Sequence, residues 1–131
     1  MNRRSDATSE IGVLGFGKMG EMHAASIMAS PNARLAAVCD ISAAARNRAA
    51  RLHPVPVFDD LGTFLRQGLD AVVVASSTQH HARHVEACAH AGVAIFTEKP
   101  IGLTMEESDR ALASVHRAGV PFQIGYQRRW D

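Results

Sequence analysis

The sequence predicts an α/β fold of the doubly wound type, in which helices cover both faces of a parallel β-sheet. Short apolar runs alternate with longer helical stretches along most of the chain, and this alternation is typical of parallel sheets with right-handed crossovers. A glycine-rich loop, Gly15-Phe16-Gly17-Lys18-Met19-Gly20, follows the first run, and Asp40 ends the second. These two features predict a ligand-binding loop at the carboxyl edge of the sheet.

Six strands are expected. Several of the apolar runs are continuous rather than alternating, and Ala71–Ala75 is the clearest example. Strands that are buried on both faces have this composition, as in a parallel sheet between two layers of helices. The predicted strands span Ile11–Leu14, Leu35–Cys39, Val55–Phe58, Ala71–Ala75, Val93–Thr97 and Phe122–Gly125.

Five helices are expected between these strands, over residues 18–30, 42–52, 59–67, 80–91 and 105–118. Ser42 is placed to cap the second helix, and Thr104 with Glu107 has the pattern of a capping box at the start of the last one. Gly92 and Gly119 each end a helix directly before a strand, because glycine adopts the left-handed conformation without strain.

Pro54 and Pro56 flank and interrupt the third predicted strand. Proline has no backbone N–H to donate to a β-ladder, so this strand is expected at an edge of the sheet. The Rossmann strand order 3-2-1-4-5-6 also places the third strand at an edge. We therefore expect one dinucleotide-binding Rossmann domain over residues 10–131, preceded by a disordered polar tail over residues 1–9.

The three glycines of the loop meet three separate steric requirements of a pyrophosphate site. Gly15 permits the tight turn, Gly17 lets a phosphate approach the backbone, and Gly20 lets the helix pack closely on the strand. The helix that begins here offers unpaired N–H groups and the positive end of its dipole to the phosphates. The cofactor-binding residues predicted for this loop are Gly15, Phe16, Gly17, Lys18, Met19 and Gly20.

Asp40 lies twenty residues after Gly20, at the end of the second predicted strand. A carboxylate at this point accepts hydrogen bonds from the adenosine ribose and repels a 2′-phosphate, and no arginine directly follows it. NAD is therefore predicted in preference to NADP. Two alternatives stay open from these residues: Asp40 can cap the helix before Ser42, and S-adenosylmethionine enzymes also place glycines and an acidic residue at these strand ends.

Three further motifs follow the fourth, fifth and sixth predicted strands. They are Ala75-Ser76-Ser77-Thr78-Gln79-His80-His81, Glu98-Lys99-Pro100 and Gly125-Tyr126-Gln127-Arg128-Arg129-Trp130-Asp131. With the glycine loop, this set resembles the Gfo/Idh/MocA family, which includes glucose–fructose oxidoreductase and inositol dehydrogenase. The resemblance covers nearly the whole chain from Ile11 onward. The chain departs from the family pattern at Ser76-Ser77, where Thr-Pro is usual, and at Trp130, where Phe or Tyr is usual.

The resemblance implies that Lys99 is the catalytic residue, near the nicotinamide and the reacting hydroxyl of the substrate. An ammonium group at the carboxyl end of a strand can orient a substrate oxygen. The resemblance also implies a cis peptide bond between Lys99 and Pro100. Beyond the glycine loop and Asp40, it assigns cofactor contacts to Ser76, Ser77, His81, Glu98, Lys99 and Arg128.

The composition argues against several other classes. Apolar residues make up 47% of the chain, and the formal net charge is +1 with both signs interspersed, so we expect no nucleic-acid partner. The apolar runs are strand-length, so we expect no membrane partner. Cys39 and Cys88 are interpreted as buried thiols of a cytoplasmic protein. His80 and His84 have the i, i+4 spacing of a metal pair, but no third ligand is evident, so we expect no metal.

The function implied by the resemblance is hydride transfer between nicotinamide and the hydroxyl-bearing carbon of a sugar or polyol, with myo-inositol as the favoured example. Family members continue past the position of Asp131 into an α+β domain that completes the substrate pocket and commonly mediates homo-oligomerisation. We expect that domain to be absent here. The alternative hypothesis is a truncated, non-catalytic module that binds NAD or a partner without turnover.

Overall fold

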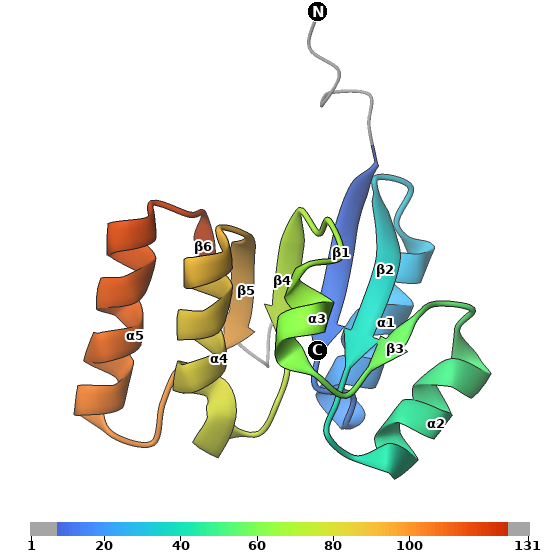
Figure 1. Ribbon diagram of the computed structural model, residues 1–131, viewed down its shortest axis with the longest axis horizontal. Coiled ribbons are helices and arrows are strands. Elements are labelled where there is room, and N and C mark those ends of the chain that lie inside the picture. Colours follow the sequence, from blue (N-terminus) through green and yellow to red (C-terminus); the bar gives the residue numbers. More distant parts are fainter. Residues whose placement is uncertain (1–7, 126–131) are drawn as a thin grey trace, which may run out of the picture.

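A computed structural model of the 131-residue chain describes residues 8–125. Strands and helices alternate throughout this range (Figure 1). The elements are β1 (Ser9–Leu14), α1 (Lys18–Ala29), β2 (Ala33–Cys39), α2 (Ala43–Leu52), β3 (Val57–Phe58), α3 (Leu61–Leu65), β4 (Ala71–Val74), α4 (Thr78–Ala91), β5 (Ala94–Glu98), α5 (Met105–Ala118) and β6 (Phe122–Gly125).

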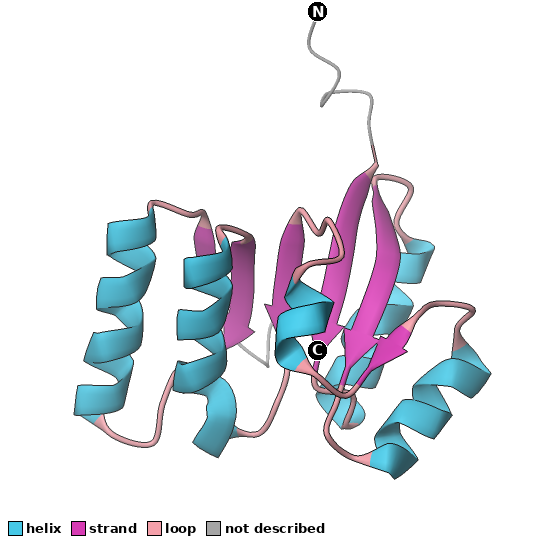
Figure 2. Ribbon diagram, in the orientation of Figure 1, coloured by secondary structure: helices cyan, strands magenta, loops and turns pink. Residues whose placement is uncertain are grey.

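The six strands form one parallel sheet in the order β3-β2-β1-β4-β5-β6, which confirms the predicted order. All strands therefore end at the same edge of the sheet, where their arrowheads gather in Figure 2. The loops that leave β1, β2, β4 and β5 at this edge carry the sequence motifs. The strand order runs outward from β1 to β3 on one side and from β4 to β6 on the other, so it reverses between β1 and β4, and a crevice is expected outside these two strand ends.

The edge strand β3 is shorter than predicted. It spans only Val57–Phe58, and the two prolines before it explain the difference. Pro56 takes part in pairing with β2 through its carbonyl oxygen, which accepts a hydrogen bond from the Val38 N–H at 3.1 Å. Since neither proline has an N–H to donate in return, the regular ladder begins only after Pro56.

Several other boundaries also differ from the prediction, and β2 begins two residues earlier, at Ala33. β1 begins at Ser9, whose N–H donates to the carbonyl oxygen of Asn32 at 3.1 Å, so Ser9 belongs to the sheet and not to the tail. Residues 1–7 of the predicted tail lie outside the described residues. The helix α3 spans only Leu61–Leu65 because Asp60 caps it, and α4 begins at Thr78, two residues earlier than predicted.

The predicted helix caps are confirmed. Ser42 accepts a hydrogen bond from the Ala45 N–H, and Thr104 accepts one from the Glu107 N–H. The Glu107 carboxylate in turn accepts a hydrogen bond from the N–H of Leu103, the residue before the cap, at 2.9 Å. Gly92 and Gly119 end α4 and α5 with φ angles of 77° and 69°, which are left-handed values that favour glycine.

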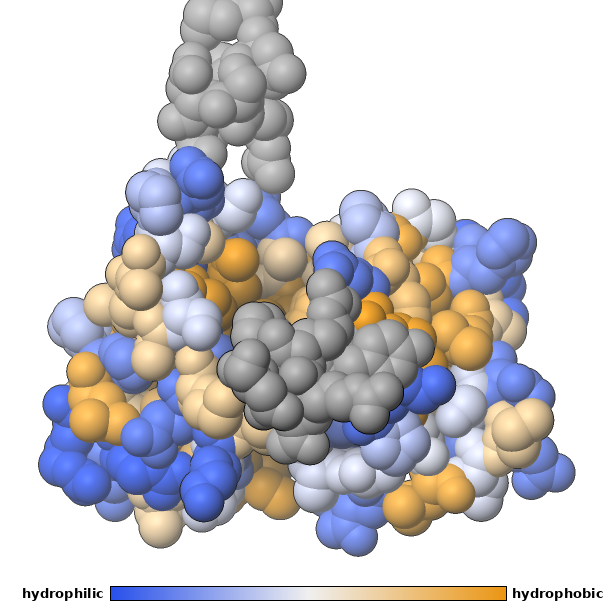
Figure 3. Space-filling view, turned by 180° about the vertical axis from the view of Figure 1, so that it is seen from behind, coloured by the Kyte–Doolittle hydropathy of each residue, from blue (hydrophilic) through white to orange (hydrophobic). Residues whose placement is uncertain are grey.

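Each face of the sheet carries its own apolar core. The face covered by α3, α4 and α5 buries Phe64, Val74 and Val85, and the face covered by α1 and α2 buries Val13 and Phe16. The short helix α2 contributes only Ala45 and Ala49, one turn apart, to this second core. Its hydrophilic side chains face outward, and they gather at the lower left when the molecule is seen from behind (Figure 3).

Cys39 and Cys88 are both buried and free of disulfides, as expected. Burial raises the pKa of each thiol to about 12, with nearby carboxylates adding to the effect at Cys39. Both cysteines are therefore protonated and unreactive near neutral pH. Between residues 8 and 125, no helix has the length and apolar character needed to cross a membrane.

Candidate functional site

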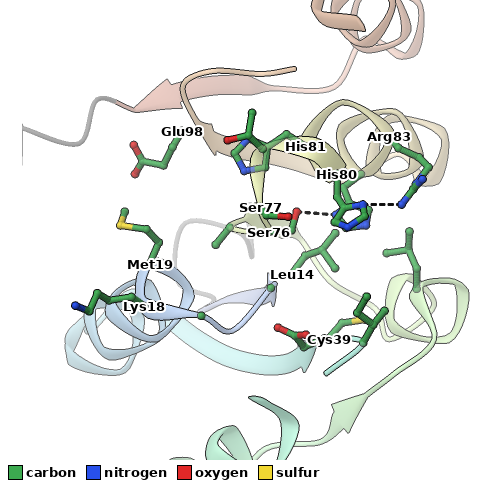
Figure 4. Close-up of a pocket in the computed structure, with 18 of the residues that line it drawn as sticks. Leu14, Lys18, Met19, Cys39, Ser76, Ser77, His80, His81, Arg83 and Glu98 are labelled. Atoms are coloured by element: carbon green, nitrogen blue, oxygen red, sulfur yellow. Dashed lines mark hydrogen bonds between the residues drawn. The ribbon is translucent and has the colours of Figure 1, made fainter. Parts of the chain in front are cut away.

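A cleft of about 600 Å³ lies at the carboxyl edge of the sheet, within the size range of small-molecule sites. It is lined by the ends of β1, β2, β4 and β5 and by the first turns of α1 and α4 (Figure 4). The predicted site residues that line it are Gly15, Gly17, Lys18, Met19, Asp40, Ser76, Ser77, His81, Glu98 and Lys99. Residues predicted from four separate motifs therefore meet in one cavity.

Three predicted site residues are not among those that line the cleft. The Phe16 side chain is fully buried in the core, with the Arg48 guanidinium 5.4 Å above its ring, so only its backbone belongs to the loop. Gly20 lies under the loop, where α1 packs against it. Arg128 lies outside the described residues.

The three glycines of the loop have distinct surroundings that match the predicted roles. Gly15 has a φ of 96°, and a Cβ atom there would lie within 2.8 Å of the backbone of Ala75 and Ser76. At Gly20, a Cβ atom would overlap the carbonyl oxygen of Gly15. At Gly17, by contrast, nothing lies within 4 Å of the position of a Cβ atom. Gly15 and Gly20 are thus required by the fold itself, whereas Gly17 leaves open space at the cleft.

The amino end of α1 is arranged to receive an anion. Gly17 is the N-cap residue, and no side chain caps the helix. The first N–H groups of α1 therefore keep hydrogen-bonding capacity beside the open space at Gly17, at the positive end of the helix dipole. This is the cradle that a pyrophosphate occupies in dinucleotide-binding folds.

The Asp40 carboxylate holds the loop and also keeps capacity for a ligand. One oxygen accepts a hydrogen bond from the Phe16 N–H at 2.7 Å, and the other accepts one from the Ser42 N–H at 2.8 Å. The second bond is a local turn next to α2, whose N-cap is Ser42, so Asp40 does not itself cap this helix. Since a carboxylate has about four acceptor positions, Asp40 retains acceptors for ribose hydroxyls, and the two roles are compatible.

Glu98 is buried next to α1 at the end of β5. Only 8% of its surface is exposed, and one carboxylate oxygen lies 3.2 Å from Nε2 of His23. The other oxygen is fully buried and accepts no hydrogen bond from the described residues. His23 also packs edge to face on Phe96 of β5. The His23–Glu98 contact therefore ties α1 to β5 beneath the cleft, a connection that the sequence interpretation did not anticipate.

The peptide bond between Lys99 and Pro100 is cis, as the family resemblance implied. His81 of α4 supports this turn, because its Nδ1 lies 2.8 Å from the carbonyl oxygen of Pro100. A carbonyl can only accept, so Nδ1 of His81 carries the proton and donates it. His81 is thus a positioning residue for the Lys99 turn as well as part of the cleft wall.

The cleft also contains residues that were not predicted as site residues. They are Leu14, Cys39, Ile41, Asp59, Leu61, Ala75, Thr78, His80, Arg83 and His84. The histidines were noted only for a possible metal, and within the described part of the chain no group of three His, Cys, Asp or Glu side chains is close enough to hold one. The signal that could have predicted them is their position at or shortly after the carboxyl ends of β1, β2, β3 and β4.

His84 has an unusual protonation state. Burial lowers its pKa from 6.5 to about 4, and the nearby Arg83, His80 and His81 add to this effect, while Asp40 opposes it. Its Nδ1 lies 2.7 Å from the hydroxyl oxygen of Ser76. The ring is therefore neutral near pH 7, hydrogen-bonded at the end of β4.

Comparisons with known proteins agree with this geometry. The family model described as "Oxidoreductase family, NAD-binding Rossmann fold", for Gfo/Idh/MocA proteins, matches residues 9–126. Inositol 2-dehydrogenase of Rhizobium meliloti is 36% identical over 124 residues, which are 95% of this chain and 38% of that protein. The scyllo-inositol 2-dehydrogenase (NAD(+)) of Bacillus subtilis is 34% identical over 91% of this chain and 36% of its own length.

A solved structure of scyllo-inositol dehydrogenase from Lactobacillus casei, with bound cofactor NAD(H) and scyllo-inositol, is similar to this chain with a TM-score of 0.85. It is 31% identical, and the match covers 95% of this chain and 38% of that protein. The chain therefore spans somewhat more than a third of the length of the relatives it matches. It belongs to the Gfo/Idh/MocA oxidoreductase family and forms the NAD-binding Rossmann fold of that family.

The contrast between Gly17 and Gly20 gives the first prediction. We expect Gly17→Val to lower the free energy of unfolding by no more than about 1 kcal/mol, because its side chain enters open space and only the preference for glycine over valine at the N-cap is lost. It should lower NADH affinity at least tenfold, because the same space is needed by the phosphates. Gly20→Ala should instead destabilise the fold by about 2 kcal/mol through overlap with backbone. Urea unfolding measures the stability of each variant, and fluorescence titration measures its affinity for NADH. Equal destabilisation by the two variants would contradict the separate roles given to Gly17 and Gly20.

The pKa of His84 gives a second prediction. In the unfolded chain His84 binds a proton near pH 6.5, whereas in the folded chain it does so only near pH 4. The unfolded state binds more protons in this window, so stability contributed by His84 is lost as the pH falls from 6.5 to 4. We expect His84→Phe to flatten the pH dependence of stability in that window, measured by urea unfolding. Parallel curves for the two proteins would argue against a neutral buried His84.

Proposed function

We propose that this chain is the NAD-binding part of an oxidoreductase that transfers a hydride between nicotinamide and the hydroxyl-bearing carbon of a sugar or polyol. A cyclitol such as myo-inositol is the preferred substrate. The observation that carries this proposal is the meeting of the glycine loop, Asp40 and Lys99 in one cleft. The inositol dehydrogenases among its relatives support the substrate class.

The order of the strand ends along the cleft indicates which end of a bound dinucleotide lies at which strand. Asp40 ends β2, the glycine loop follows β1, and Glu98 with Lys99 comes at the end of β5. With the adenosine ribose at Asp40 and the phosphates at α1, the nicotinamide half extends past β4 toward Lys99. β2 and β5 are three strand spacings apart, about 14 Å. When bound, NAD supplies the group that exchanges a hydride with the substrate carbon.

Lys99 acts on the substrate hydroxyl in this proposal. Its ammonium group donates a hydrogen bond to the hydroxyl oxygen and fixes the carbon that exchanges the hydride. In the oxidation direction the hydroxyl loses a proton while its carbon gives up the hydride, and the neutral amine form of Lys99 would accept that proton; in the reverse direction the ammonium form would return it to the carbonyl oxygen. The cis bond to Pro100 and the His81 hydrogen bond to the Pro100 carbonyl hold the Lys99 backbone in place.

The proposal also covers the compartment, the domain organisation and the assembly of the protein. We propose a small-molecule substrate in a cytoplasmic protein, which the two free, buried cysteines support because reducing compartments keep thiols unpaired. Residues 10–131 would form a single domain, and homo-oligomerisation would arise through parts of the protein that the relatives have in addition. Ser76, Ser77 and the backbone of Phe16 would contribute cofactor contacts beside Asp40.

The first test concerns the choice of cofactor. We expect the chain to bind NADH more tightly than NADPH, because the Asp40 carboxylate repels a 2′-phosphate. Asp40→Ala should weaken NADH binding about tenfold, the value of a hydrogen bond to a charged acceptor, and should bring NADPH close to NADH. Fluorescence titration measures both affinities. Asp109→Ala, an exposed aspartate of α5, is the control, and an unchanged preference in Asp40→Ala would refute the role of Asp40.

The second test concerns Lys99. We would replace the matching segment of the Rhizobium meliloti inositol 2-dehydrogenase by this chain and measure NADH production with myo-inositol. Lys99→Met in this chimera should lower kcat at least 100-fold, as expected for loss of a proton-transfer residue, with NADH affinity changed less than threefold. Lys18→Met at the phosphate end is the comparison variant, and it should act on NADH affinity instead. A chimera that binds NADH and turns over equally well with Lys99→Met would exclude Lys99 from the reaction.

A further inference from the structure

The backbone of Phe16, inside the glycine loop, is held on two sides by residues of β2 and α2. Its N–H donates to the Asp40 carboxylate at 2.7 Å. Its carbonyl oxygen accepts a hydrogen bond from Nη2 of Arg48, in the second turn of α2. Among the described residues, Arg48 is not one of those that line the cleft. Arg48 therefore acts on the loop rather than on a ligand in the cleft.

Three contacts fix the Arg48 guanidinium at once. Besides its bond to the Phe16 carbonyl, its Nε donates to Oε1 of Glu21 in α1 at 3.2 Å. Its central carbon also lies 5.4 Å from the centre of the buried Phe16 ring, which in turn meets His53 edge to face. Because a guanidinium is a rigid planar fork with five N–H donors, it can hold two acceptors in one fixed geometry. Arg48 thus joins α1, α2 and the glycine loop at one point.

The direction of the Phe16 carbonyl fixes the direction of the next N–H group. The Phe16–Gly17 peptide bond is trans, and in a planar trans peptide the C=O and the following N–H point in opposite directions. With the carbonyl turned toward Arg48, the Gly17 N–H is turned away from α2. Gly17 lines the cleft and begins α1 as its N-cap. The bond from Arg48 therefore keeps the Gly17 N–H on the side where the phosphates are expected.

Arg48 also offsets a negative charge close to the phosphate site. Glu21 lies in the first turn of α1, and its N–H donates to the Gly17 carbonyl at 2.9 Å. A carboxylate in the first turn suits the helix dipole but repels a bound pyrophosphate. Since the Glu21 carboxylate is paired with Arg48, its charge is partly neutralised where the phosphates bind.

We propose that Arg48 is a positioning residue for the pyrophosphate of the dinucleotide, because it holds the Phe16–Gly17 peptide so that the Gly17 N–H is offered to a phosphate. Glycine leaves its own backbone unusually free, so this peptide needs a hold from outside the loop. Asp40 fixes the N–H side of Phe16, and Arg48 fixes the carbonyl side. This inference rests on the binding of NAD by the glycine loop but not on hydride transfer or on Lys99.

The test measures NADH binding by fluorescence and adenosine binding by NMR titration, on the 131-residue chain and its variants. Arg48→Met keeps an aliphatic side chain but has no donor, and NADH binding should weaken about tenfold, as for loss of a hydrogen bond to a charged group. Arg48→Lys keeps the charge but not the fork, so NADH binding should stay about threefold weaker than in the unmodified chain. Adenosine has no phosphate, and its affinity should not change in either variant.

Arg51→Met, at an exposed arginine in the last turn of the same helix, is the matched control and should change neither affinity. The side chains of Arg48 and Glu21 are 35% and 46% exposed, so their ion pair adds little to stability and the variants should fold. Circular dichroism checks the fold before binding is compared. If Arg48→Met does not fold, the comparison of Arg48→Lys with the unmodified chain decides.

Unchanged NADH affinity in Arg48→Met would overturn the proposal. Full affinity in Arg48→Lys would also overturn it, because charge alone would then be enough. An equal loss of adenosine and NADH affinity would contradict it as well, since the substitution would have damaged the whole cleft. If the unmodified chain does not bind NADH, the cofactor site is wrong and the proposed function fails with it. If NADH binds and the Arg48 variants bind it equally well, only the role of Arg48 is wrong.

Discussion

The backbone of Gly15 is the fixed point on which the rest of the site depends. Its N–H donates to the carbonyl oxygen of Cys39 at 2.8 Å, which joins the end of β1 to the end of β2. Its φ of 96° turns the chain so tightly that a Cβ atom would overlap the backbone of Ser76, at the end of β4. Three strand ends are therefore held around one residue without a side chain. The Asp40 bond to the Phe16 N–H then sets the loop above them, and α1 begins with its N–H groups facing the space beside Gly17.

The helix α4 connects the two ends of the cleft. His81 donates to the Pro100 carbonyl and so supports the turn that carries Lys99, while His84, about one turn further along, contacts Ser76 and lies near Asp40. One rigid helix thus carries both the side chain that contacts Ser76 at the end of β4 and the side chain that supports the Lys99 turn. The buried His23–Glu98 contact fixes β5 to α1 from the other face of the sheet.

The strand order, the helix caps and the glycine roles were predictable because they follow from local rules. Pro54 and Pro56 have no N–H, Gly92 and Gly119 tolerate positive φ, and continuous apolar runs mark strands buried on both faces. The His23–Glu98 pair and the Ser76–His84 contact were not predictable from the sequence, because residues 75 and 8 positions apart meet only after the sheet and helices have packed. The predicted lengths of β3 and α3 were too long. The prolines delay the start of β3, and Asp60 caps α3 so that the helix begins only at Leu61.

The central claim is that the ends of β1, β2, β4 and β5 form a single dinucleotide site. NMR spectra of the 15N-labelled chain, recorded during a titration with NADH, test this claim residue by residue. The account predicts saturable shifts of the amide signals in Gly15–Gly20, at Asp40 and Ile41, from Ser76 to His84, and at Glu98 and Lys99. The amides from Ala33 to Ala36, which line a separate small groove, should not shift. Saturable shifts confined to that groove, or none at millimolar NADH, would contradict the account.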